Sequence, residues 1–448
     1  MVTPPEEVPA GAVPTGAADQ LWFANRQVWT EPMMEAVRRG GPEGGKWYWL
    51  HDKVFASRTL REAYAQVAAN RGAPGVDGVT VEAFGARLEE EIARLLAAWR
   101  AERFRPQAVR RVWIPKPGSS ERRPLGIPTV RDRVVQAALR LVLEPIFEMD
   151  FHPRSHGFRP GRKAHDALSE VLWCLNAGQV WVVDADLQGY FDSIPHGPLL
   201  KAVQQRVTDR RLVQLISDYL KAGIMESGEV TEPEHGSPQG GVISPLLANI
   251  YLNDLDHTMA QAGWTMTRYA DDFVILCRTQ AEAERALAEV KSWTGRTGLV
   301  LHPTKTRIVD LGQPGNCVDF LGFRLQRQRD KDGRERFLRL IRPKSLTQVT
   351  ESIRQRTKRT SGESLGEIIR QLNRTLGGWF SYFRSVHSSI HHRLDQAARR
   401  RLRAILAARR GVPNWGGGQG HNRWTNTFFA EHGLLSLQDA HARFLHPC

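Results

Sequence analysis

Two adjacent aspartates, Asp271 and Asp272, constrain this chain more than any other feature. They lie between two β-forming runs, Trp264 to Tyr269 and Phe273 to Cys277. Two such runs joined by a tight polar turn predict a β-hairpin with the acids at its tip. Neighbouring carboxylates at a tip repel each other and cannot fill a core, so we expect a cation to neutralise them.

A third acid for such a site lies far upstream. The run Val180 to Val183 predicts a strand that leads directly into Asp184 and Asp186. These two aspartates share one face of that strand, so spacing alone does not choose between them. Carboxylates from distant segments can hold two Mg²⁺ ions about 4 Å apart, which clamp an attacking 3′-hydroxyl and a leaving pyrophosphate. The pattern predicts a template-directed polymerase.

The distribution of charge indicates an acidic partner. The chain of 448 residues carries 62 lysines and arginines against 48 acids, a formal net charge of +14. Residues 351–410 hold 14 of the basic residues and 4 of the acids, a local excess of 10. A basic excess gathered in one region is typical of nucleic-acid binding, whereas an evenly basic surface would indicate only solubility.

Several other classes of protein are disfavoured. The four cysteines, Cys174, Cys277, Cys317 and Cys448, are scattered singly without C-x-x-C spacing, which argues against a disulfide framework and a zinc module. No apolar run reaches about 18 residues, and no signal-peptide pattern is present. We expect a cytoplasmic protein with no membrane partner.

The order of predicted elements favours the α+β class. Helical spacing predicts helices at 50–69, 81–99, 132–147 with an interruption at Pro145, 163–178, 198–221, 242–255 and 279–295. The strands that carry the acids alternate with these helices, so we expect an antiparallel sheet to support the site. Residues 351–410 lack β-branched runs and predict two or three further helices. Residues 1–44 are predicted to be a disordered or flexible extension, because residues 1–20 are rich in Pro, Gly and Ala.

Eight short motifs occur in a fixed order along the chain. They are Gly75 to Gly78, Ile114 to Lys116, Arg123 to Pro128, Ser155 to Pro160, the Asp186 segment, Gly236 to Gly240, Tyr269 to Asp272, and Phe320 to Phe323. This ordered set, over about residues 45–410, resembles the reverse transcriptase–maturase proteins encoded within group II introns. The resemblance implies a right-hand polymerase with fingers and palm over 45–330. It also implies a helical thumb or maturase domain over 340–410, followed by a small nucleic-acid-binding segment over 411–448.

The resemblance also implies an activity and its partners. The protein would be an RNA-directed DNA polymerase of a mobile intron, copying an RNA template onto a DNA primer with deoxynucleoside triphosphates. It would bind intron RNA to assist splicing, in a bacterial cytoplasm and at the nucleoid when bound to DNA. No Cys-paired, His-rich nuclease pattern follows residue 411, so we expect the form that lacks the C-terminal endonuclease. Two alternatives stay open: a non-enzymatic RNA-binding splicing factor with an idle polymerase pocket, and a related reverse transcriptase recruited to phage defence or a CRISPR locus.

By the same resemblance, three acids form the catalytic centre. Asp186, Asp271 and Asp272 would be catalytic and would bind two Mg²⁺ ions, with the carbonyl of Leu187 as a further ligand. Asp186 and Asp271 would be the principal ligands. Asp184 would be a supporting or structural acid.

The residues expected to bind the incoming nucleotide are Lys116, Arg123, Phe191, Gln239 and Lys305. Lys116 and Arg123 flank the predicted loop of a fingers hairpin and would contact the triphosphate. Because Arg122 is the neighbouring residue, the sequence does not decide which of the two arginines makes this contact. Phe191 would exclude a ribose 2′-hydroxyl, or else be a core aromatic. Gln239, in a glycine-rich loop, would donate amide hydrogen bonds. By the same resemblance Lys305 would lie near the leaving pyrophosphate and protonate it, or else it is a surface lysine.

Arginines in two regions are expected to bind RNA. Arg159 and Arg162 lie in a Gly/Pro loop with an aromatic, which suits either template binding or a rigid connector. In the helical region the candidates are Arg374, Arg384, Arg399, Arg400, Arg401 and Arg403. A surface of this kind suits structured RNA, which is read largely by shape and backbone.

Overall fold

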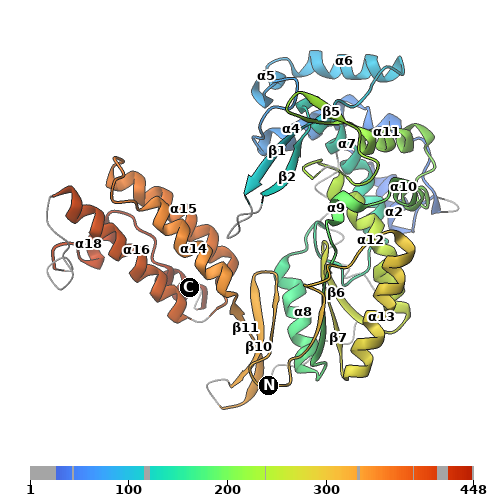
Figure 1. Ribbon diagram of the computed structural model, residues 1–448. Coiled ribbons are helices and arrows are strands. Elements are labelled where there is room, and N and C mark those ends of the chain that lie inside the picture. Colours follow the sequence, from blue (N-terminus) through green and yellow to red (C-terminus); the bar gives the residue numbers. More distant parts are fainter. Residues whose placement is uncertain are drawn as a thin grey trace. The chain divides into compact units, whose positions relative to one another are not determined.

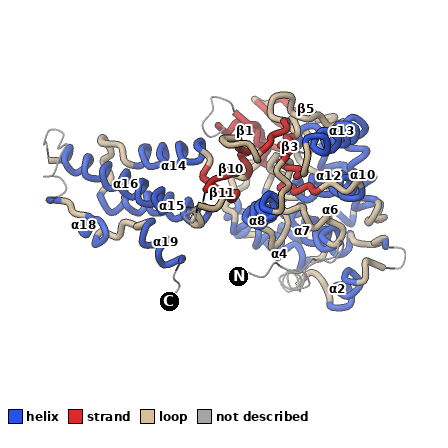
Figure 2. Tube along the Cα trace, turned by 90° about the horizontal axis from the view of Figure 1, so that it is seen from below, coloured by secondary structure: helices blue, strands red, loops and turns tan. Residues whose placement is uncertain are grey.

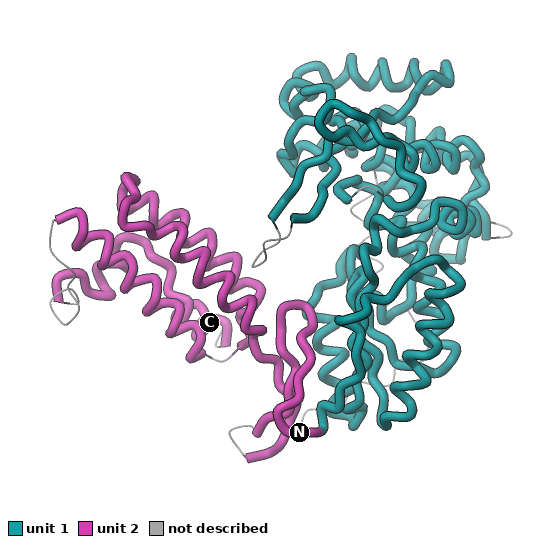
Figure 3. Tube along the Cα trace, in the orientation of Figure 1, with its two compact units in different colours: residues 1–312 teal, residues 313–448 magenta. Residues whose placement is uncertain are grey.

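The computed structural model describes residues 27–42, 45–115, 122–237, 239–329, 333–386, 388–410 and 422–445. The chain forms two compact units, Met1–Gly312 and Gln313–Cys448 (Figure 3), each with a hydrophobic core. The strands after Gly312 form a separate sheet within the second unit. The domain bounds expected from the sequence, 45–330 and 340–410, stay a prediction.

The candidate acids lie on a four-stranded sheet of the first unit. Its strands are β3 (Trp181–Asp186), β6 (Thr265–Tyr269), β7 (Asp272–Cys277) and β8 (Arg307–Asp310). The order is β6-β7-β3-β8, and every neighbouring pair is antiparallel. Three helices pack against this sheet: α8 (Ala164–Asn176), α12 (Ser244–Gln261) and α13 (Gln280–Thr297) (Figure 1). The predicted mixture of helices with an antiparallel sheet is confirmed.

A second sheet of this unit carries the predicted fingers hairpin. Its strands are β1 (Val109–Pro115), β2 (Arg122–Ile127), β4 (Ile224–Glu226) and β5 (Glu229–Thr231), in the order β2-β1-β4-β5. β1 and β2 are antiparallel over their whole length, from Arg110 opposite Ile127 to Pro115 opposite Arg122. The predicted hairpin is therefore formed, with its loop outside the described residues.

Helices make up the rest of the first unit. They are α2 (Glu31–Arg38), α3 (His51–Val54), α4 (Ser57–Ala69), α5 (Val81–Gly85), α6 (Leu88–Arg100), α7 (Val130–Glu148), α9 (Tyr190–Ser193), α10 (His196–Gln204) and α11 (Arg210–Lys221). α7 is buried along most of its length and starts at Thr129, whose side chain accepts from the Asp132 N–H. The predicted interruption at Pro145 is wrong, because the helix continues to Glu148.

The expected flexible extension over 1–44 is wrong for the part that the structure describes. Val28, Trp29 and Met34 are each at most 2% exposed and belong to the core. The indole Nε1–H of Trp29 donates to the Leu141 carbonyl at 3.0 Å. A buried tryptophan with a satisfied N–H fixes the start of the described chain on α7.

The second unit combines a small sheet with a helical bundle. Its elements are β9 (Cys317–Phe320), β10 (Phe323–Arg329), β11 (Glu335–Ile341), α14 (Pro343–Arg356), α15 (Leu365–Phe383), α16 (Ser388–Arg409), α18 (Asn426–Glu431) and α19 (Leu437–Leu445) (Figure 2). Buried aliphatic side chains of α14, α15 and α16 form its core. Within the described residues of both units, no helix is long and apolar enough to cross a membrane.

Candidate active site

The predicted acidic hairpin is present, with Asp186 beside it. β6 and β7 are joined by the turn at Ala270 and Asp271, and Asp272 begins β7. Asp186, the last residue of β3, lies directly opposite Asp272 across the β3–β7 ladder. Side chains of opposite residues in an antiparallel pair share one face of the sheet. Asp186 and Asp272 therefore face the same side, at the end of the sheet where Asp271 turns.

The backbone of the turn is held by a buried arginine. Ala270 has φ of 60°, a left-handed conformation that costs a residue with a side chain about 1–2 kcal/mol. Arg268 is fully buried and donates through Nη1 to the Ala270 carbonyl at 2.9 Å and to Asn249 Oδ1 at 3.0 Å. The same guanidinium forms an ion pair with Asp256 of α12. Arg268 thus connects the turn at Ala270 and Asp271 to α12.

The loop Ser155 to Pro160 packs against the same turn. The His156 N–H donates to the Arg268 carbonyl at 2.9 Å, and the Asn249 amide donates to the Gly157 carbonyl at 2.7 Å. A Cβ on Gly157 would lie 2.1 Å from the Ala270 nitrogen, so only glycine allows this approach. The loop supports the acids from the edge of β6.

That loop does not offer Arg159 to RNA, and the prediction of an RNA contact there is wrong. The Arg159 side chain is 3% exposed and forms an ion pair with Glu148 at 2.7 Å. It also donates to the carbonyls of His152 and Ser155. Arg162 is half-buried and donates to the Pro153 carbonyl at 2.6 Å. Of the two alternatives for this loop, template binding and a rigid connector, these contacts favour the rigid connector.

A lysine lies beside one of the acids. Lys305 Nζ lies 2.5 Å from Asp186 Oδ2, while Arg307 Nε lies 3.1 Å from Asp184 Oδ2. Burial raises the pKa of Asp271, the charge of Asp186 raises that pKa as well, and Lys305 and Arg268 lower it. The site thus concentrates negative charge that favours a cation, and Asp184 has an arginine partner of its own.

The chemistry of these donors fits a hard divalent cation. Among the described residues, no three His, Cys, Asp or Glu side chains stand close enough to form an ion-binding cluster. Nevertheless Asp186 and Asp272 are register partners, and the Lys305 ammonium occupies the position of a cation at Asp186. Carboxylate oxygens are the ligands that Mg²⁺ prefers. Leu187, whose carbonyl is the further predicted ligand, follows Asp186 with a buried side chain.

The nucleotide-binding candidates Phe191 and Gln239 lie on two segments that are hydrogen-bonded to each other. The Ser237 N–H donates to the Phe191 carbonyl at 2.7 Å. Phe191 is half-buried, and its ring stands edge-on to the exposed ring of Phe158, with centroids 6.2 Å apart. The Gln239 side chain donates to Asp192 Oδ2 at 3.2 Å. Both residues are held in place by contacts within this unit.

Of the two predicted triphosphate contacts, one is described. Arg123 lies opposite Ile114 on the β1–β2 hairpin, with an exposed side chain. Its neighbour Arg122 is also exposed. Lys116 lies outside the described residues.

The arginines of the second unit divide into exposed and buried ones. Arg374, Arg384 and Arg400 are exposed, and Arg399 is half-buried. Arg403 is 9% exposed and donates to the Trp424 carbonyl and to Asn426 Oδ1. Arg403 is therefore largely enclosed by the second unit, and its contact with RNA stays a prediction.

The sequence assigned no roles to Arg268, Asn249 and Asp256, which hold the turn at Ala270 and Asp271 in place. One signal was available for Arg268. It shares a strand face with the buried Met266, and an arginine on an apolar face requires a buried partner. The partners themselves, on a helix, gave no signal in the sequence.

Comparison with known proteins identifies two family regions in this chain. Residues 114–325 match the family described as "Reverse transcriptase (RNA-dependent DNA polymerase)", and residues 346–424 match "Group II intron, maturase-specific domain". Protein YkfC of Escherichia coli K12 is 36% identical over 323 residues, which cover 63% of this chain and 84% of YkfC. The chain belongs to the group II intron reverse transcriptase and maturase family.

Two further similarities cover less of the proteins concerned. The group II intron-encoded protein LtrA of Lactococcus lactis subsp. cremoris is 40% identical over 201 residues, 44% of this chain and 33% of LtrA. A chain of the solved "Partial Cas6-RT-Cas1--Cas2 complex" is 24% identical with a TM-score of 0.35, over 55% of this chain and 42% of that chain. The reverse transcriptase and maturase-specific regions lie in the order that the motifs predicted.

Proposed function

We propose that this member of the family is an RNA-directed DNA polymerase that extends a DNA primer with deoxynucleoside triphosphates. The observation that carries the proposal is the position of Asp186 directly opposite Asp272, with Asp271 at the adjoining turn and Lys305 at Asp186. Asp186, Asp271 and Asp272 would hold Mg²⁺, together with the Leu187 carbonyl. When bound, such ions stabilise the charge that develops on the attacking and leaving oxygens.

The chain's own residues would position the substrate and handle its protons. Arg123, with Lys116 of the hairpin loop, would bind the triphosphate through charge-assisted hydrogen bonds. The Phe191 ring would stand under the sugar and exclude a 2′-hydroxyl. Gln239 would hydrogen-bond the nucleotide from its loop, where Asp192 already orients its amide. Lys305 Nζ would hold the proton that the departing pyrophosphate takes up.

Primer extension on an RNA template with deoxynucleotides and Mg²⁺ tests this proposal. Asp271→Asn should reduce the extension rate by at least about a thousandfold, because a neutral amide is a far weaker cation ligand than a carboxylate. RNA affinity, measured in parallel, should stay within about twofold of wild type. Equal extension by variant and wild type would exclude Asp271 from the chemistry. Absence of extension by the wild type, with RNA binding intact, would favour the non-enzymatic splicing factor.

A second function, assistance of intron RNA splicing, is favoured by the maturase-specific match over residues 346–424. The exposed arginines Arg374, Arg384 and Arg400 of the same region would contact the RNA backbone. Adding the protein to a self-splicing group II intron RNA at low Mg²⁺ should increase the splicing rate. The Asp271→Asn variant should retain that effect, since its substitution lies in the polymerase site.

A further inference from the structure

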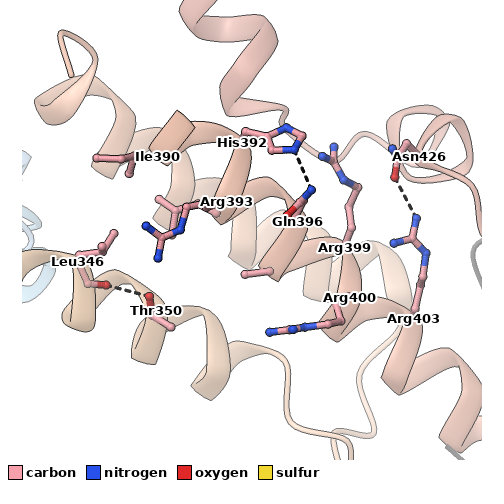
Figure 4. Close-up of a pocket in the computed structure, with 12 residues that line it drawn as sticks. Leu346, Thr350, Ile390, His392, Arg393, Gln396, Arg399, Arg400, Arg403 and Asn426 are labelled. Atoms are coloured by element: carbon pink, nitrogen blue, oxygen red, sulfur yellow. Dashed lines mark hydrogen bonds between the residues drawn. The ribbon is translucent and has the colours of Figure 1, made fainter. Parts of the chain in front are cut away.

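The second unit contains a pocket that the proposed polymerase does not use. It measures about 580 Å³ and lies between α14 and α16, with Asn426 of α18 at one end (Figure 4). That volume is within the range of about 300–1,000 Å³ that is usual for small-ligand sites. A flat basic surface would suffice for the backbone of an RNA duplex, so a concave pocket indicates a ligand that enters it.

One wall of the pocket is strongly basic. Arg393, Arg399 and Arg400 of α16 line it, and no lining residue is acidic. Within the described part of the chain, none of these three guanidinium groups has a carboxylate or hydrogen-bond partner. Figure 4 shows Arg393 and Arg400 directed toward the α14 side. They are seven residues apart on one helix face, about 10 Å along its axis, so their long side chains can bind two negative charges of one ligand at the same time.

The rest of the lining adds two further features. Arg403, beside Asn426, donates to the Trp424 carbonyl and to the Asn426 side chain, so part of the positive charge is held in place. Leu346 of α14 and Ile390 of α16 supply apolar surface. A ligand with both phosphate charge and an apolar ring system can contact the basic and the apolar residues, whereas an inorganic anion would leave the apolar residues uncovered.

A polar group in the pocket could distinguish ribose from deoxyribose. Gln396 donates through Nε2 to the His392 ring at 2.7 Å, which fixes the orientation of its amide. Its carbonyl oxygen has no hydrogen-bond partner among the described residues. An acceptor held beside phosphate-binding arginines is suited to a ribose 2′-hydroxyl, the group that separates RNA from DNA.

We propose that this pocket receives a single unpaired nucleotide extruded from folded RNA, with its flanking phosphates on Arg393 and Arg400 and its base against Leu346 and Ile390. The proposal rests on the RNA-binding part of the proposed function and gives it a specific target. The helical unit would then recognise bulged positions in RNA, in addition to the general backbone charge. Unstacked bases are the usual basis of sequence-selective RNA recognition.

The test compares two RNA hairpins that differ by one bulged nucleotide, using fluorescence anisotropy with the full-length protein. The bulged hairpin should bind about tenfold more tightly than the fully paired one. Arg400→Gln should remove about tenfold of the affinity for the bulged hairpin, the usual effect of losing a charge-assisted hydrogen bond, and much less for the paired one. Ile390→Ala should reduce the preference for the bulge severalfold. The deoxy version of the bulged hairpin should bind less tightly, and Gln396→Ala should remove that difference.

A matched variant and a separate assay keep the outcomes apart. Arg370→Gln removes one exposed arginine of α15, outside the pocket, and should leave the preference for the bulge unchanged. Two outcomes would overturn the proposal that the pocket binds the bulged nucleotide. One is equal affinity of the wild type for both hairpins, and the other is an equal effect of Arg370→Gln and Arg400→Gln on the affinity for the bulged hairpin. Failure to bind either hairpin would instead overturn the RNA-binding function on which it rests. Primer extension by the same preparations reports the polymerase independently.

Discussion

The ion pair between Arg268 and Asp256 is buried on both sides, with side-chain exposures of 0% and 2%. Asp256→Asn would leave the Arg268 guanidinium in the core without its counter-charge. Breaking a buried pair in this way costs about 3–5 kcal/mol. We therefore expect the free energy of unfolding of the first unit to fall by that amount, as measured by urea denaturation followed by circular dichroism.

An exposed ion pair provides the control for this prediction. Arg94 and Glu90 are paired on the surface of α6, with side-chain exposures of 57% and 56%. Glu90→Gln should change the free energy of unfolding by less than about 1 kcal/mol, because exposed pairs contribute little. A cost for Asp256→Asn no larger than this would show that the buried pair does not stabilise the catalytic turn.

Residues were predictable where their chemistry allowed few uses. Asp271 and Asp272 at a hairpin tip indicated a site because paired acids have no role in a core. The ion pair of Lys305 with Asp186 was not predicted from the sequence. Arg159 and Arg403 were not predictable. The sequence of a basic segment does not distinguish an arginine that faces solvent from one that donates to buried carbonyls, because the difference depends on the tertiary structure.

At the scale of elements, the loop Ser155 to Pro160 determines where the catalytic turn lies. Gly157→Ala would place a Cβ 2.1 Å from the Ala270 nitrogen, so the loop or the turn must move. A displacement of about 1 Å at a reacting group can reduce a rate by about a hundredfold. We expect a loss of that order in kcat for primer extension, with little change in RNA affinity.

Gly197 of α10 is a suitable control for this substitution. A Cβ there would meet no heavy atom within 4 Å, and its backbone is helical. Gly197→Ala should therefore leave kcat unchanged and slightly stabilise the helix. Full activity of Gly157→Ala would mean that the loop does not position Asp271.

The helical bundle of the second unit contains a buried histidine where α15, α16 and α19 meet. His391 is 0% exposed and packs against the rings of Trp379, Phe380 and His441. Burial, and to a lesser extent the charge of His441, lowers the pKa of His391 from its ordinary value of 6.5 to about 4. The folded state thus keeps the ring neutral, while the unfolded chain takes up a proton below about pH 6.5.

This pKa shift predicts that the second unit loses stability in acid. The contribution of the neutral His391 ring to the free energy of unfolding is fully present above pH 6.5. It is lost as the pH falls from 6.5 to about 4, a total of about 3 kcal/mol. His391→Phe cannot titrate and should reduce the acid-induced loss by that amount. Urea denaturation between pH 4 and 7.5 measures both proteins, and parallel curves for the two would contradict the assignment to His391.

Elements were predictable where a single periodicity extended over their whole length. The acidic hairpin and the helices of the second unit are present in the structure. The predicted helix over 198–221 divides into α10 and α11, with Asp209 accepting from the Leu212 N–H at the start of the second. Local spacing did not reveal the N-terminal contact of Trp29 with α7 either, because that contact depends on a partner 112 residues away.

The whole molecule divides its chemistry between two units. The acids and their supporting residues belong to the first unit, whereas residues 351–410 hold 10 of the 14 excess positive charges. The sequence predicted this division of roles, since charge and motif content are local properties. The grouping of β9, β10 and β11 into a sheet of their own was not predictable from the sequence, because it depends on strand pairing between separate segments.

The concentration of charge in the second unit predicts that RNA binding depends steeply on salt. Each neutralised phosphate releases counterions, and a protein with about six such contacts loses roughly a thousandfold in affinity between about 50 and 200 mM salt. We expect the Kd for intron RNA to rise by about that factor over the same range of salt, as measured by filter binding. Neutralising both Arg374 and Arg384 to Gln should lower the slope of log Kd against log salt by about two. Arg61→Gln, at an ion pair of the first unit, should leave the slope unchanged. A slope near zero for the wild type would show that its RNA contacts are not phosphate contacts, and the basic region would then need another explanation.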